Sequence, residues 1–88
     1  MKKLTGRVAV VTGAASGIGR ATALLLARRG CAIAIADVNT AGLAETAGLV
    51  KKLGVKLSTH HVDVSDKARM QAFADEVVLT HGGVNILV

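Results

Sequence analysis

The sequence predicts an α/β fold in which three helices cover a parallel, doubly wound sheet. Two observations predict this class. Apolar runs that do not alternate with polar residues, such as 8–11, indicate strands that are buried on both faces of a sheet. Segments with helical spacing separate these runs, so strands and helices alternate along the chain. Right-handed crossovers between parallel strands then predict the strand order 3-2-1-4.

Length and composition fit one small globular domain over residues 1–88. The chain has 88 residues, of which 51% are hydrophobic, and it has no proline. Phe73 is its one aromatic residue, so valine, leucine, isoleucine and alanine must build the core. Such side chains suit parallel strands that are covered by helices.

The first half of the chain contains two predicted strands and one helix. Residues 7–12 form the first strand, and the helix follows over 16–29. Arginines in its last turn complement the helix dipole, and Gly30 ends the helix. The second buried strand, 32–36, ends on Asp37.

Two further predicted helices flank a more polar strand. Asn39 is the expected N-cap of the second helix, which ends before Gly54. The strand over 56–62 is more polar than the first two strands, which predicts an outer position in the sheet. Ser65 is the expected N-cap of the third helix, which ends at Gly82.

A glycine-rich turn lies directly after the first apolar run. Residues 12–19 read Thr-Gly-Ala-Ala-Ser-Gly-Ile-Gly, so the spacing is G-x-x-x-G-x-G and not the commoner G-x-G-x-x-G. A strand that passes through such a turn into a helix brings backbone N–H groups up to a phosphate. Glycine permits this approach because it has no side chain and tolerates a positive φ. The candidate cofactor-binding residues of this turn are Gly13, Ser16, Gly17, Ile18 and Gly19.

This turn resembles the TGxxxGIG cofactor motif of the short-chain dehydrogenase/reductase family and matches it residue for residue. The resemblance extends over all 88 residues, which is roughly the first third of a usual member. It implies a partial Rossmann-type fold in a family that transfers hydride between a nicotinamide cofactor and an alcohol or carbonyl substrate. The family's chemistry uses a serine and a Tyr-x-x-x-Lys pair farther along, and this chain has no tyrosine. We therefore expect a dinucleotide-binding domain that is incomplete at its C-terminal end and inactive by itself.

An acidic residue, Asp37, ends the second strand about 20 residues after the glycines, as in dinucleotide-binding domains. Its carboxylate can accept hydrogen bonds from both ribose hydroxyls of adenosine and would repel a 2′-phosphate. The alternative is that Asp37 only forms the turn before the second helix. In the family that the chain resembles, NADP-preferring members carry a cation at the places of Ser16 or Val38. The predicted cofactor is therefore NAD rather than NADP.

A second acidic residue, Asp63, follows the third strand. The resemblance implies that Asp63 and Val64 line the adenine pocket, where the carboxylate receives the exocyclic amine and a backbone N–H serves a ring nitrogen. The alternative is that Asp63 contributes to the cap of the third helix together with Ser65 and Asp66.

Charge and composition argue against several other classes. The formal net charge of +5 comes from scattered cations without aromatic stacking residues, so we expect no nucleic-acid partner. No apolar run approaches the roughly 18 residues of a membrane span, and we expect no membrane contact. One cysteine, Cys31, fits a reducing, cytoplasmic location. The adjacent His60 and His61 would point to opposite faces of a strand, so no metal site is expected.

Residues 84–88 form the fourth predicted strand, which would lie beside the first. Its outer side would be a bare apolar edge without lysine or proline. This edge keeps an alternative function open, a non-catalytic nucleotide-binding module or one that associates with itself through the fourth strand.

Overall fold

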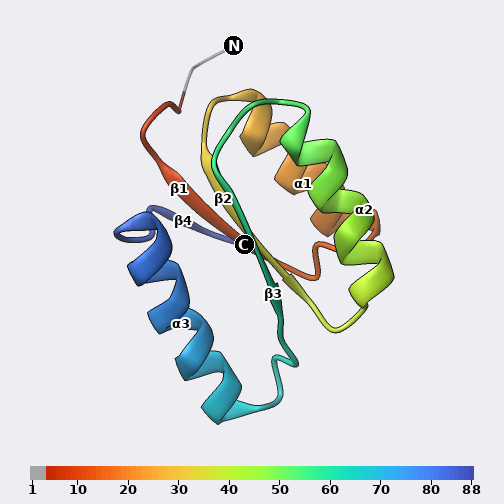
Figure 1. Cartoon of the computed structure of the whole chain (residues 1–88), viewed down its shortest axis with the longest axis vertical. Coiled ribbons are helices and arrows are strands. Elements are labelled where there is room, and N and C mark those ends of the chain that lie inside the picture. The colour runs from red at the N-terminus through yellow and green to blue at the C-terminus, as the bar shows by residue number, and fades with distance from the viewer. Residues whose placement is uncertain (1–3) are drawn as a thin grey trace.

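A parallel sheet in the order β3-β2-β1-β4 forms the centre of the molecule, as predicted (Figure 1). The structure is a computed structural model that describes residues 4–88. Strands and helices alternate along the chain, as expected for a doubly wound domain. The elements are β1 (Val8–Thr12), α1 (Gly17–Arg28), β2 (Ala32–Asp37), α2 (Thr40–Lys51), β3 (Leu57–His61), α3 (Lys67–His81) and β4 (Ile86–Leu87).

The two central strands are buried because helices cover both faces of the sheet. Helices α1 and α2 lie on one face, and α3 lies on the other (Figure 1). Residues of β1 alternate between the two cores: Ala9 and Val11 pack toward α1 and α2, whereas Val8 and Val10 pack with Phe73 of α3. This two-sided burial explains why the apolar runs of the sequence do not alternate.

The helix ends follow the predicted signals with one correction. The Asn39 side chain accepts a hydrogen bond from the N–H of Gly42 at the start of α2. At α3 the N-cap is Asp66 and not Ser65, because the Asp66 carboxylate accepts from the Arg69 N–H at 3.0 Å. Ser65 instead hydrogen-bonds to the Asp63 side chain.

The fourth strand is shorter than the predicted 84–88. It pairs with β1 over the residue pairs Ala9–Ile86 and Val10–Leu87. Just before it, the Asn85 side-chain oxygen accepts from the N–H of Val8 at 2.8 Å, so a side chain takes the place of a backbone ladder partner. Strand β4 itself covers two residues, and backbone hydrogen bonds to β1 continue on both sides of it, from the Asn85 N–H to the Val8 carbonyl oxygen and from the Val88 N–H to the Val10 carbonyl oxygen.

Within residues 4–88, no helix combines the length and the apolar character that a bilayer crossing requires.

Candidate dinucleotide-binding site

The turn between β1 and α1 has the backbone conformation that its glycines predict. Gly13 and Gly17 both have positive φ, +64° and +57°. A Cβ added at either residue would meet nothing within 4 Å, so space lies open above the turn. A Cβ at Gly19 would overlap the carbonyl group of Gly13, so this glycine permits the close approach of α1 to the turn. The three glycines thus have two separate tasks.

The start of α1 lacks the capping that the other two helices have. Ser16 is the N-cap residue, yet its side chain makes no capping hydrogen bond, and the first turn contains no acidic residue. The first N–H groups of a helix have no intrahelical acceptor, and the helix dipole favours an anion there. Ile18 is exposed beside them. A pyrophosphate group fits this position by its charge and by the space above the glycines.

Helix α2 supports the turn through contacts that sequence reasoning missed. The buried Thr46 hydroxyl donates to the carbonyl oxygen of Ala14 at 2.7 Å and accepts from Arg20 Nε at 2.8 Å. The Arg20 guanidinium also donates to the carbonyl oxygens of Ala15 and Gly42. Arg20 therefore joins α1 to α2. The one sign of this contact in the sequence was Gly42, because glycine is a weak helix former and lies inside α2. A Cβ at this position would collide with Ala15, so glycine permits the close approach of α2 to the turn.

The Asp37 carboxylate lies at the end of β2 and binds the glycine turn directly. One of its oxygens accepts from the N–H of Ala15 at 2.9 Å, and the other accepts from the N–H groups of Val38 and Asn39. Burial acts to raise the pKa of Asp37, but the backbone donors at Ala15, Asn39 and Val38 outweigh it and hold the pKa below its usual value. Asp37 thus forms the turn, as the alternative predicted, and it also lies beside the candidate phosphate site.

A cavity of about 330 Å³ connects the glycine turn with the ends of β2 and β3. Its size falls within the usual range of small-molecule sites, roughly 300–1,000 Å³. Two acidic side chains line it, and its lining contains no basic residue to bind a 2′-phosphate. The lining residues are Thr12, Gly13, Ala36, Asp37, Val38, Val62, Asp63 and Val64.

Asp63 lies on the β3 side of this cavity. Its carboxylate accepts hydrogen bonds from the hydroxyl and from the N–H of Ser65. Both bonds lower the pKa of Asp63, and the bond from the hydroxyl has the larger effect. The charged carboxylate is fully exposed at the mouth of the cavity, next to the exposed Val64. The structure therefore brings Asp63 and Val64 to the same cavity as Asp37 and Gly13.

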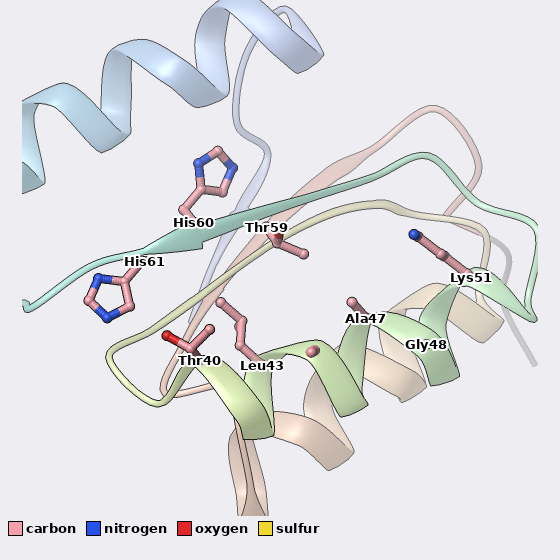
Figure 2. Close-up of a pocket in the computed structure, with 9 residues that line it drawn as sticks. Thr40, Leu43, Ala47, Gly48, Lys51, Thr59, His60 and His61 are labelled. Atoms are coloured by element: carbon pink, nitrogen blue, oxygen red, sulfur yellow. The ribbon is translucent and has the colours of Figure 1, made fainter.

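A larger groove, about 510 Å³, lies between α2 and β3, away from the glycine turn (Figure 2). Its α2 wall consists largely of small or apolar side chains such as Ala47 and Gly48. His60 and His61 point to opposite sides of β3 (Figure 2). Among the described residues, no group of three His, Cys, Asp or Glu side chains could hold a metal ion. The candidate site is the smaller cavity, because the glycines and the strand ends meet there.

Known proteins resemble this chain in sequence and in fold. The family model described as short chain dehydrogenase matches residues 7–88. (+)-Borneol dehydrogenase 1 of Salvia officinalis is 43% identical over 86 residues, which are 98% of this chain and 32% of that protein. A short chain dehydrogenase/reductase from Burkholderia phymatum, solved in complex with NAD, is 39% identical with a TM-score of 0.92, over 99% of this chain and 31% of that one.

Carveol dehydrogenase from Mycobacterium avium, also solved with NAD, is 33% identical with a TM-score of 0.93. The alignment covers 99% of this chain and 36% of that protein, so the chain spans about a third of the length of these relatives. The match with the family model covers most of the chain, and the fold agrees with the solved structures. The chain belongs to the short-chain dehydrogenase family.

Proposed function

We propose that this chain is the NAD-binding part of an oxidoreductase. The observation that carries the proposal is the glycine turn that leads into the uncapped start of α1. Through Gly13 this turn lines the same cavity as two strand-end carboxylates, Asp37 and Asp63. A dinucleotide has a matching pattern of groups, since its pyrophosphate lies between a ribose and further rings. Two similar structures contain NAD, which supports the same ligand here.

Each part of the cofactor has a proposed partner in this cavity. The pyrophosphate binds at the N–H groups of the turn, where Gly13 and Gly17 leave space. The adenosine ribose binds at Asp37. The adenine ring lies between Val38 and Val64, and the Asp63 carboxylate accepts a hydrogen bond from its exocyclic amine.

The absence of a cation from the cavity lining favours NAD over NADP. A 2′-phosphate at Asp37 would meet a carboxylate whose pKa is already low, so the two negative charges would repel each other at neutral pH. Arg20 cannot compensate in its present position, because its guanidinium is engaged with Thr46 and with backbone carbonyl oxygens.

When bound, the nicotinamide ring supplies or accepts the hydride in a reaction that interconverts an alcohol and a carbonyl. This chain contributes the binding site and the orientation of the cofactor. It has no tyrosine to act as the family's general acid, so we expect the chain alone to bind NAD without turnover. A cytoplasmic location stays a prediction.

Isothermal titration calorimetry with NAD and NADP tests the proposal. We expect NAD to bind at least about 10-fold more tightly, because a charge-assisted set of hydrogen bonds to the ribose contributes roughly 1.5–3 kcal/mol. The absence of NAD binding would overturn the proposed function. Tighter binding of NADP would overturn the role of Asp37 and leave the dinucleotide site in place.

A second candidate function, self-association through β4, has one observation in its favour. Leu87 is 75% exposed, and Val84 and Val88 are about half exposed, at a sheet edge that nothing in the described chain pairs with. Such an edge is a template for pairing with another strand. The two functions are compatible, because the exposed edge is the side of β4 that does not pair with β1, whereas the glycine turn follows the end of β1 at Thr12.

A further inference from the structure

Arg69 joins the two ends of the loop 62–66, which carries Asp63. Its Nε donates to the carbonyl oxygen of His61 at 3.0 Å, where β3 ends. Its backbone N–H donates to the Asp66 carboxylate at 3.0 Å, where α3 begins. Residue 69 therefore contacts both ends of this loop, the β3 end through its side chain and the α3 end through its backbone N–H.

The Arg69 side chain is held in place by Glu76, two turns farther along α3. Arg69 Nη1 lies 2.6 Å from Glu76 Oε2, and Nη2 lies 3.3 Å from Oε1. Such a fork between guanidinium and carboxylate fixes orientation as well as distance. Hydrogen bonds from Arg69 first, and then from His60, hold the pKa of Glu76 below its usual value. The carboxylate is therefore charged at neutral pH.

Glu76 is in turn fixed from the strand side by the buried His60. His60 Nδ1 lies 2.7 Å from Glu76 Oε1, and the imidazole ring packs against Phe73 at a centroid distance of 4.9 Å. The Ser58 hydroxyl lies 2.7 Å from His60 Nε2 and 2.8 Å from His81 Nε2. Figure 2 shows His60 on the side of β3 that faces α3, opposite to His61.

We infer that Arg69 is a positioning residue for the adenine side of the dinucleotide site, and that Glu76 and His60 keep it oriented. The inference rests on the proposed function, in which Asp63 accepts the exocyclic amine of adenine. Within its own loop the exposed Asp63 side chain contacts Ser65 alone. The backbone on either side is held by the Val62 N–H on the Asp37 carbonyl oxygen and by the Asp66 N–H on the Asp63 carbonyl oxygen. The Arg69 side chain adds the anchor at the His61 end, which Arg69→Ala removes, whereas the backbone bond to Asp66 remains in that variant.

The chemistry of the base gives a readout that a purely structural role would not change. Hypoxanthine carries a carbonyl oxygen where adenine carries its amine, so a carboxylate at Asp63 accepts a hydrogen bond from adenine and repels hypoxanthine. A general loss of stability would weaken NAD and nicotinamide hypoxanthine dinucleotide equally. A displaced loop would weaken NAD selectively and so reduce the ratio of the two affinities.

The experiment measures both dissociation constants by calorimetry for the unmodified chain, Arg69→Ala, Glu76→Gln and Lys67→Ala. Lys67→Ala is the matched control, because it removes one cation from the same turn without touching the loop ends. We expect the unmodified chain and Lys67→Ala to prefer NAD about 10-fold, as one charge-assisted hydrogen bond allows. Arg69→Ala should bind the two nucleotides within about twofold of each other. Glu76→Gln keeps the Arg69 bond to His61, and we expect its preference for NAD to be about threefold smaller than that of the unmodified chain.

Amide spectra recorded without ligand give an independent readout. In Arg69→Ala the N–H signal of Ser65, which donates to Asp63, should shift or broaden, while that of Gly42 at the α2 cap should stay unchanged. If Arg69→Ala fails to fold, Glu76→Gln decides the outcome.

If Arg69→Ala has the same ratio of the two affinities as the unmodified chain, the role of Arg69 is overturned. The role is also overturned if Lys67→Ala loses as much of the preference for NAD as Arg69→Ala does. An unmodified chain that binds NAD but has no preference between the bases would overturn the adenine contact and this inference with it. An unmodified chain that binds neither nucleotide would overturn the proposed function itself.

Discussion

Asp37 has two roles at the residue scale, and they can be separated experimentally. Its oxygens accept hydrogen bonds from three backbone N–H groups, and the same residue also lines the cavity. Asp37→Asn keeps the shape, removes the charge and replaces one acceptor oxygen with an NH2 donor, so urea unfolding of the variant accompanies the binding measurement. We expect NAD binding to weaken by roughly 1.5–3 kcal/mol while NADP binding changes less, because the repulsion of its phosphate is removed together with the ribose contact.

Calorimetry with both nucleotides measures this change, and Asp75→Asn on the exposed side of α3 is the control for the lost charge. Equal losses for NAD and NADP would contradict a role of Asp37 in choosing the cofactor.

The glycines of the turn predict two different mutant phenotypes. Gly17→Ala points a methyl group into open space at a positive φ, so we expect lost NAD binding with a stability loss of only about 1–2 kcal/mol. Gly19→Ala places a methyl group on the Gly13 carbonyl, so we expect a larger loss of stability. Urea unfolding combined with NAD titration separates the two effects. A Gly17 variant with unchanged NAD affinity would contradict the phosphate site.

For single residues, the sequence predicted those that line the cavity better than those that hold the glycine turn in place. Gly13 and Asp37 belong to a local motif with fixed spacing, so they can be recognised without a structure. Arg20 and Thr46 act through tertiary contacts between α1 and α2, and their positions in the sequence contain no sign of that pairing. The same holds for Arg69, whose partners lie on β3 and farther along α3.

At the scale of elements, local signals predicted every strand and helix, and the errors lie at their ends. Ser65 and Asp66 are both good N-cap residues, and the choice between them depends on Asp63, which engages Ser65. The fourth strand is shorter than predicted, although Asn85 and Val88 on either side of it still form backbone hydrogen bonds with β1.

The exposed edge at β4 predicts self-association. The structure selects Leu87, 75% exposed, as the residue to change, because Ile86 packs partly into the core. Leu87→Lys places a charge at the edge, and we expect it to reduce association at high concentration. Sedimentation velocity over a concentration series measures this, with Leu79→Lys, 87% exposed on α3, as the control. An unmodified chain that stays monomeric throughout would contradict the proposal.

At the scale of the whole molecule, stability should fall toward acid pH. The pKa of His81 is lowered by burial first, and then by Lys56 and His60. Its unfolded pKa is about 6.5, so between that value and the folded pKa the unfolded chain binds more protons. The contribution of His81 is therefore fully present above about pH 6.5 and is lost as the pH falls through the folded pKa.

Urea unfolding at several pH values tests this prediction. The carboxyl groups of Glu76 and Asp37 also have lowered pKa values, so their contributions are lost at lower pH, below about 4. His81→Gln should therefore reduce the pH dependence of stability just below about pH 6.5 and leave the loss of stability below about pH 4 unchanged. An unchanged slope in that window would contradict the lowered pKa of His81.

Mapping on the amide spectrum of the chain tests most directly whether NAD binds at the glycine turn. We expect NAD to shift the signals of Gly13, of residues 16–19 and of Val38 and Val64, because these line the turn and its cavity. Signals of Ala47 and Gly48, in the separate groove between α2 and β3, should stay in place. Shifts confined to that groove, with none in the glycine turn, would contradict the account.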